Sequence, residues 1–353
     1  MKIFLLCGLA LLLSGCASEH FFAVSSATDA TGGIYIIDGN TASHALPLPR
    51  SNYIIRKNDT IYITQNAARK SVDKSGLLHT VDLNTMKILQ SVKVNGITPC
   101  HVVVSPDGKF LYTANYSSGS VSEIALEKGI PCPQVRVIQH QGKGKDPRRQ
   151  KSPHPHFVGF DPAGSQLFVC DLGTDEIWVY NYIKEKGVVL PSVEKLKLPP
   201  GSGPRHLAFV PDGKTIYTAN ELDSTATSFI KTSGSWKMVK TISTRLEVQA
   251  AKKNFPGAIK ITSDGRYFFI TNRGDDTIAV FKTSGNGDFE LIANVDALGK
   301  YPSDILIDEK NQVLYTVNLK NGTAAKFKMN LTAGTLEAMP EKYDIPRGIS
   351  LCK

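Results

Sequence analysis

The chain has 353 residues, of which 41% are hydrophobic and 21% are charged. These fractions exclude a disordered chain and a protein made mainly of membrane spans. The formal net charge is +9, and no face or helix concentrates it, which favours an anionic small molecule or surface as partner over nucleic acid.

The first residues have the pattern of an export signal. Lys2 precedes a short apolar run, too short to span a bilayer as a stable helix, which ends in Leu13-Ser14-Gly15-Cys16. This ending resembles a bacterial lipobox, in which the cysteine thiol is acylated. The alternative is an ordinary signal with a chance cysteine at the cleavage point.

We therefore expect a signal peptide at 1–15, a lipidated N-terminus and short tether at 16–20, and one domain at 21–353. The resemblance to lipoproteins implies export and tethering to a membrane through lipid on Cys16. Ala17 favours the outer membrane, facing the periplasm.

Four cysteines remain beyond the signal, and their spacing fits no zinc motif. Outside the cytoplasm a disulfide is permitted, and Cys100 and Cys132 are the nearest pair in the sequence. Four free thiols are the alternative. No metal or cofactor is expected.

An internal repeat determines the architecture. Five segments align without gaps over fifteen positions, and a sixth, 52–66, keeps the spacing. The five are His101–Asn115, His156–Cys170, His206–Asn220, Ala258–Asn272 and Asp304–Asn318. Each contains two short β runs joined by a turn such as Ser105-Pro106-Asp107-Gly108, in which Gly supplies the positive φ. A third run follows, as at 120–124 and 277–281.

About four short strands in every 46 to 55 residues are typical of propeller blades. After the sixth unit, 346–351 matches the first strand of a further unit, and the chain then ends. Strands at 21–25 and 33–37 near the N-terminus lack such a first strand. The sequence therefore predicts an all-β, seven-bladed β-propeller whose last blade is closed by pairing of N- and C-terminal strands, which leaves no free edge.

The repeat also predicts a site. The start of the first strand and the end of the second lie at the same end of a hairpin, so one mouth of the central channel should collect those residues from every blade. They include three histidines, three arginines and several carboxylates: His101, His156, His206, Arg205, Arg273, Arg347, Asp171, Glu221 and Asp304, with Tyr116 and Leu319 at equivalent positions. The asparagines that end the second strands are expected to be structural caps.

Several stretches resemble the lactonase-type propellers, a family that includes the bacterial propeller form of 6-phosphogluconolactonase and the carboxy-cis,cis-muconate cyclase. They are Gly203-Pro204-Arg205-His206 with Asn220-Glu221, Asn272-Arg273-Gly274, and the loop 140–156 with its spaced glycines, Arg149-Gln150 and His154-Pro155-His156. Leu111-Tyr112-Thr113-Ala114-Asn115 and 314–318 also resemble the broader YVTN-repeat propellers.

The resemblance implies that His156, Arg205, Glu221 and Arg273 are catalytic. Substrate binding is expected from His101, Tyr116, Arg149, Gln150, His154, His206 and Asp304, although His101 and His206 would equally suit satisfied structural positions. The basic run 143–151 is either a solvated loop or a loop over the site.

In hydrolysis of a lactone, His156 suits the base, and Arg205 and Arg273 suit the carbonyl oxygen or a substrate anion. Glu221 is expected between the two arginines, leaving about one positive charge for an anionic ligand. A lactonising cyclase would use the same groups.

Two classes of function follow. The first is a lipid-anchored, monomeric lactonase-like hydrolase that opens a lactone of a sugar acid. The alternative is a non-catalytic propeller that binds an anionic sugar, cell-wall fragment or partner protein through the same mouth.

Overall fold

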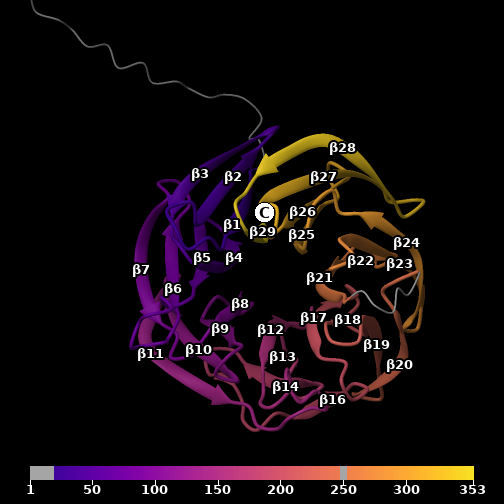
Figure 1. Ribbon diagram of the computed structural model, residues 1–353. Coiled ribbons are helices and arrows are strands. Elements are labelled where there is room, and N and C mark those ends of the chain that lie inside the picture. Colours follow the sequence, from indigo (N-terminus) through magenta and orange to yellow (C-terminus); the bar gives the residue numbers. More distant parts are fainter. Residues whose placement is uncertain (1–19, 247–252) are drawn as a thin grey trace, which may run out of the picture.

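The computed structural model describes residues 20–246 and 253–353, which form seven β-sheets arranged radially around a common central axis (Figure 1). The predicted all-β propeller is confirmed. The expected signal peptide and the lipid-bearing Cys16 lie outside the described residues. Within the described residues, no helix is long and apolar enough to cross a bilayer.

We number the blades in chain order. Blades 1 to 3 contain β4 (Ser51–Lys57), β5 (Thr60–Gln65), β6 (Leu77–Asp82) and β7 (Lys87–Lys93); β8 (Pro99–Val104), β9 (Phe110–Asn115), β10 (Ser120–Glu127) and β11 (Ile130–Gln139); and β12 (Pro155–Phe160), β13 (Gln166–Asp171), β14 (Glu176–Ile183), β15 (Gly187–Val188) and β16 (Glu194–Lys197).

Blades 4 to 6 contain β17 (Pro204–Phe209), β18 (Thr215–Asn220), β19 (Thr225–Thr232) and β20 (Ser235–Ser243); β21 (Phe255–Ile261), β22 (Tyr267–Arg273), β23 (Thr277–Gly285) and β24 (Asp288–Asp296); and β25 (Pro302–Asp308), β26 (Val313–Asn318), β27 (Thr323–Asn330) and β28 (Thr335–Asp344). Blade 7 contains β29 (Gly348–Cys352), β1 (Phe21–Ser25), β2 (Gly33–Asp38) and β3 (Thr41–Pro47).

Blade 7 closes the ring as predicted, because β29 at the C-terminus pairs antiparallel with β1. In every blade the strands are antiparallel neighbours, and the innermost strand contacts the innermost strands of the adjacent blades (Figure 1). The channel mouth is therefore built from seven strand ends that are far apart in sequence.

Blade 3 differs from the four strands expected, because two short strands share its outer edge. The end of β14 pairs with β15, and the start of β14 pairs with β16. Pro191 lies between the two and has no N–H to give to the ladder, so the outer strand is interrupted there.

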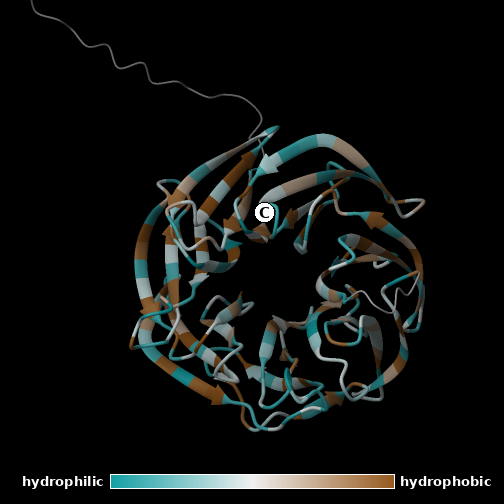
Figure 2. Ribbon diagram, in the orientation of Figure 1, coloured by the Kyte–Doolittle hydropathy of each residue, from teal (hydrophilic) through white to brown (hydrophobic). Residues whose placement is uncertain are grey.

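Hydrophobic and hydrophilic residues alternate along the strands (Figure 2), as a sheet with packed faces requires. The buried side chains form seven clusters, and each joins two neighbouring blades, as Leu78 and Leu111 do between blades 1 and 2. Packing between blades thus holds the ring and fixes the mouth.

All four described cysteines are free, so the Cys100–Cys132 disulfide considered above is not formed. The reason is topological. Cys100 lies on β8 and Cys132 on β11, the inner and outer strands of one four-stranded blade. Three strand spacings separate them by about 14 Å, beyond the reach of a disulfide.

Candidate active site

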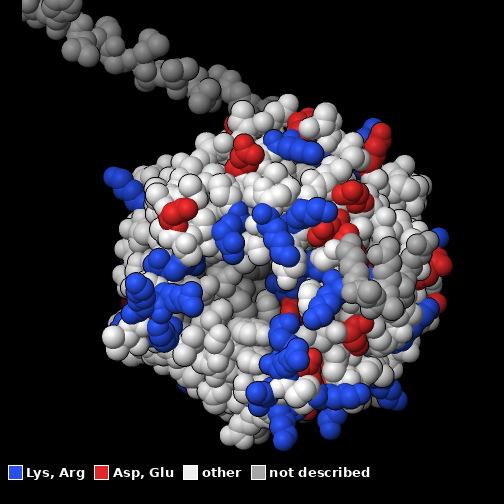
Figure 3. Space-filling view, viewed as in Figure 1, with Lys and Arg blue, Asp and Glu red and all other residues white. Residues whose placement is uncertain are grey.

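A cavity of about 410 Å³ opens at one mouth of the channel and is lined by residues from all seven blades. The space-filling view shows a hollow at the centre of the ring, with Lys and Arg side chains gathered along its rim (Figure 3). The lining residues are Asn52, Tyr53, Asn66, Thr98, Cys100, Tyr116, Arg149, His156, Arg205, His206, Glu221, Arg273, Tyr301, Ser303, Asp304 and Ile349.

β-Bulges create this lining. In each inner strand the pairing register shifts at the mouth end, so one or two residues have no partner on the second strand. A bulge re-aims the extra side chain, and in six blades it points into the cavity. The residues concerned are Asn52 and Tyr53, Cys100, His156, Arg205, Ser303 and Ile349. In five blades a proline precedes the bulge, as Pro204 precedes Arg205.

The pairing of strands in blade 3 shows that the sequence alignment of its repeat unit with the other units was wrong by one residue. Pro155 pairs with Asp171, as Pro99 pairs with Asn115 and Pro204 with Asn220. His156 is therefore equivalent to Cys100 and Arg205, and Asp171 takes the place of the capping asparagines.

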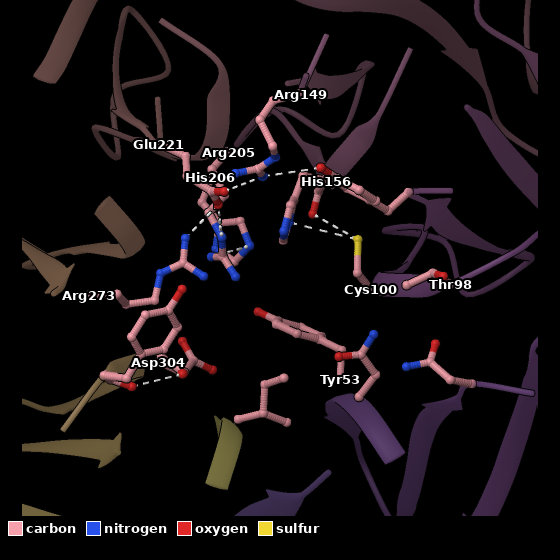
Figure 4. A pocket seen from close by; sticks show the side chains of 16 residues that line it. Tyr53, Thr98, Cys100, Arg149, His156, Arg205, His206, Glu221, Arg273 and Asp304 are labelled. Atoms are coloured by element: carbon pink, nitrogen blue, oxygen red, sulfur yellow. Dashed lines mark hydrogen bonds and ion pairs between the residues drawn. The ribbon is translucent and has the colours of Figure 1, made fainter. Parts of the chain in front are cut away.

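One carboxylate organises the charged wall of the cavity (Figure 4). Glu221 Oε2 lies 2.5 Å from Arg273 Nη2 and 3.2 Å from Arg205 Nε, and Glu221 Oε1 lies 2.6 Å from Arg149 Nη2. The Arg205 contact is an ion pair without hydrogen-bond alignment, since its Nε–H has no acceptor. Burial alone would raise the pKa of Glu221, but these guanidinium groups hold it well below its usual value.

Glu221 thus lies between Arg205 and Arg273 as expected. Arg149, however, joins the same carboxylate, and burial with nearby Arg273 lowers the pKa of Arg205 only to about 10. Three charged guanidinium groups on one carboxylate leave two positive charges on this wall at neutral pH. The sequence analysis expected about one positive charge on this wall, which was too low because it did not count Arg149.

The arginines are held in different ways. Arg273 also donates from Nε to the Phe255 carbonyl at 2.9 Å, and Arg205 Nη1 donates to His206 Nε2 at 3.1 Å. Both extend from strands and are buried. Arg149 extends from the connection between β11 and β12, donates to Tyr116 Oη at 3.2 Å, and is half-exposed.

His156 faces this wall, with Nδ1 3.8 Å from Cys100 Sγ and no hydrogen bond from its Nε2 to any described residue. Burial and the charge of Arg205 lower its pKa well below 6.5. The imidazole is therefore uncharged at neutral pH, as a proton acceptor must be.

The other two histidines differ. The ring centroid of His206 lies 5.3 Å from the ring centroid of His156 and 5.3 Å from that of His101. His206 lines the cavity, whereas His101 is packed behind it against Tyr53 and Phe157 and accepts the Val158 N–H at 3.5 Å.

Asp304 lies on the Arg273 side of the cavity, on the inner strand of the next blade (Figure 4). Its Oδ1 accepts the Ile305 N–H and its Oδ2 the Leu351 N–H, both at 2.9 Å, and burial raises its pKa. The cavity therefore has a hydrogen-bond acceptor next to its cationic wall.

Gln150 and His154 are not part of the lining. Gln150 Nε2 donates to Leu172 O and to Asp175 Oδ1, which fastens the loop, and His154 stacks on Tyr116 with ring centroids 4.5 Å apart. His154 thus lies behind Tyr116, which does line the cavity. Asp171, Leu319 and Arg347 also lie outside it.

Residues that the sequence analysis did not assign to the site include Tyr53, Thr98 and Tyr301. Thr98 and Tyr301 precede the prolines before the bulges, with positive φ of 60° and 64°. Their shared position in the sequence, directly before the proline of the inner strand, was the signal that could have identified them as site residues. No group of three or more His, Cys, Asp or Glu side chains that could hold a metal is found in the part of the chain described.

Comparison with known proteins agrees with this geometry. The family model described as "Lactonase, 7-bladed beta-propeller" matches residues 22–352. A 6-phosphogluconolactonase of Bacillus subtilis is 30% identical over 329 residues, which cover 89% of this chain and 92% of that protein.

Two solved structures are similar throughout. A putative 6-phosphogluconolactonase from Bacteroides fragilis has a TM-score of 0.84 at 27% identity, covering 95% of this chain and 98% of that one. The periplasmic gluconolactonase PpgL of Pseudomonas aeruginosa has a TM-score of 0.86 at 24% identity, covering 94% and 98%, which supports the fold alone. This chain belongs to the lactonase family of seven-bladed β-propellers.

Proposed function

We propose that this chain hydrolyses the lactone of a sugar acid in the cavity at the channel mouth. The observation that carries the proposal is the convergence of three guanidinium groups on Glu221 beside an uncharged His156. The name of the 6-phosphogluconolactonase relative from Bacillus subtilis supports the same class of substrate.

The proposed reaction uses water as nucleophile. Neutral His156 takes a proton from water as the oxygen attacks the lactone carbonyl carbon, and a tetrahedral oxyanion forms. Guanidinium N–H groups of Arg205 and Arg273 stabilise that oxyanion. The bond from this carbon to the ring oxygen then breaks, and the His156 proton passes to the leaving oxygen, which becomes a hydroxyl. The product is a hydroxy acid, whose carboxyl group then releases its proton to the solvent and becomes a carboxylate.

The charge distribution favours an anionic sugar. Two net positive charges on the Glu221 wall suit a substrate phosphate or carboxylate together with the developing oxyanion. Asp304, in the blade that follows that of Arg273, suits a sugar hydroxyl as hydrogen-bond donor. We propose this pairing as the basis of substrate orientation.

The test compares wild type with His156→Gln on a panel of aldonolactones, measuring proton release above spontaneous hydrolysis. Loss of at least 100-fold in kcat is expected, since one general base contributes about 10² to 10⁴. His44→Ala on outer strand β3, stacked on Tyr35, is the matched control and should retain the rate. Full turnover by His156→Gln would exclude this base; no turnover by wild type, with lactone binding retained, would favour the non-catalytic alternative.

We also propose export and anchoring through lipid on Cys16, on the basis of the N-terminal sequence. Cys16→Ser should move the protein from the membrane to the soluble fraction. Retention of that variant in membranes at high salt would contradict the anchor.

A further inference from the structure

Arg149 is the one guanidinium on Glu221 that no strand holds. It belongs to the connection 140–154 between β11 and β12, and its side chain is 36% exposed, against 9% and 10% for Arg205 and Arg273. Its place in the cavity therefore depends on whatever fixes this connection.

A single buried carboxylate contacts both ends of the connection. Asp171 Oδ2 lies 2.7 Å from Nδ1 of His140, the first residue of the connection. Asp171 Oδ1 accepts the backbone N–H of His154, the last residue, also at 2.7 Å. The side chains of Asp171 and His140 are fully buried, so water does not compete for either contact.

His140 is itself fixed on its other faces. Its Nε2 lies 3.1 Å from Tyr180 Oη, and its ring stacks on Trp178 with centroids 4.0 Å apart. At the far end, His154 Nδ1 donates to the Tyr116 carbonyl at 2.8 Å, and Tyr116 Oη accepts from Arg149. A continuous set of contacts thus runs from Asp171 to the Arg149 guanidinium.

The other blades show what is special here. At the position equivalent to Asp171, Asn272 donates to the Thr244 carbonyl at 2.9 Å and Asn318 to the Ala297 carbonyl at 3.3 Å. In those blades an amide holds the backbone that arrives from the preceding blade. Among the seven described blades, only blade 3 has a carboxylate at this position; the others have asparagine, glutamine or serine. The connection that this carboxylate holds carries Arg149, a charged residue of the cavity.

We propose that Asp171 and His140 form a clasp that positions Arg149 against Glu221 and so sets the charge of the cavity. They are positioning residues, because neither lines the cavity. The effect on catalysis rests on the proposed function, whereas the effect on the loop does not.

The first experiment measures the loop without any substrate. The connection contains five trypsin sites, at Lys143, Lys145, Arg148, Arg149 and Lys151. Asp171→Ala in the full chain should accelerate tryptic cleavage between residues 143 and 152 at least tenfold. Asp171→Asn should cleave at an intermediate rate, because the amide still accepts the His154 N–H. The matched control is Asp161→Asn, which removes a turn carboxylate of the same blade and should leave loop cleavage unchanged.

The second experiment measures activity. Asp171→Ala and Arg149→Ala should each lower kcat/KM tenfold or more on an anionic lactone, and the double variant should be no slower than Arg149→Ala alone. Such non-additivity is expected when two residues act through one group. The clasp would be overturned if the loss of kcat/KM in the double variant equalled the product of the two single losses, or if Asp171→Ala left the rate of loop cleavage unchanged. If Asp171→Ala does not fold, Tyr180→Phe supplies the same comparison. A wild type without lactonase activity would overturn the proposed function, and the proteolysis would still decide the clasp.

Discussion

Glu221 and Asp171 are two buried carboxylates at the ends of second strands in neighbouring blades, and they have different roles. Glu221 points into the cavity and contacts three guanidinium groups, whereas Asp171 points toward the incoming connection and contacts His140. In the repeat they are one residue apart, because Asp171 is equivalent to Asn220, the residue before Glu221.

Successive side chains of a strand point to opposite faces, and here that single step exchanges a place in the cavity for one behind it. The residue type alone does not reveal which role a carboxylate has. What distinguishes the two is the partner set, three cations for Glu221 and a histidine with a backbone amide for Asp171.

The largest expected effect is that of Glu221→Gln. It leaves three cations without their buried carboxylate, so we expect a loss of about 3–5 kcal/mol in the free energy of unfolding and loss of measurable turnover. Urea unfolding and initial rates test this. Since the folded-state pKa of Glu221 lies below its usual value, its contribution is present above the unfolded pKa near 4.5 and is lost as the pH falls below it. An equal loss in Asp171→Asn would break the comparison.

The next effect separates the two kinds of arginine. Arg273→Ala should lower kcat/KM about 10- to 100-fold on anionic lactones, the range of about 1.5–3 kcal/mol for a hydrogen bond to a charged group. The same substitution should lower kcat/KM much less on neutral lactones. Rising salt should weaken binding of the anionic substrates, because screening grows. Equal losses on both substrate types would show that Arg273 does not contact the anionic group of the substrate.

A smaller effect concerns pH. Burial, with neighbouring charges, holds the pKa of His101, His156 and His206 well below 6.5. As the pH falls below about 6.5, the unfolded chain binds protons that the folded chain does not, so stability declines by about 1 kcal/mol per histidine per pH unit. Urea unfolding at pH 7.5 and 5.5 measures the decline. The His206→Gln variant should lose less stability between these two pH values than the wild type. An equal decline in both proteins would contradict a lowered pKa of His206 in the folded state.

The smallest effect is expected at Cys100, which occupies the same bulge position as His156 and Arg205. Burial raises the pKa of its thiol to about 12, so it is protonated at neutral pH and is not a nucleophile. Cys100→Ser should change kcat/KM less than threefold. A loss above tenfold would show that the thiol takes part in the reaction.

The fold could be predicted from the sequence because the repeat is local. The turn residues, the asparagines at 115, 220, 272 and 318, and the incomplete unit at each terminus determine the blade number and its closure. The interrupted edge strand of blade 3 could not be predicted in this way, since its segment 184–198 has no counterpart in the other units.

The site was predictable to the level of strand ends. Arg205, Glu221 and Arg273 meet as expected, because each lies at the same end of its hairpin. The sequence did not reveal the bulges, which are a property of pairing between strands, nor the one-residue offset of blade 3. Arg149 was recognised only through family resemblance, since its contact with Glu221 spans two blades and a loop.

The bulged residues have a consequence for how such a ring can acquire new specificities. A bulged residue has no ladder partner on the second strand, so the pairing that holds the blade does not depend on which side chain it carries. The seven positions that begin the inner strands hold residues as different as Cys100, Arg205, Ser303 and Ile349 in otherwise similar blades. Substitutions there can change the chemistry of the cavity while the hydrogen-bonded ladder of each blade stays intact, so ligand preference and strand pairing are free to evolve separately.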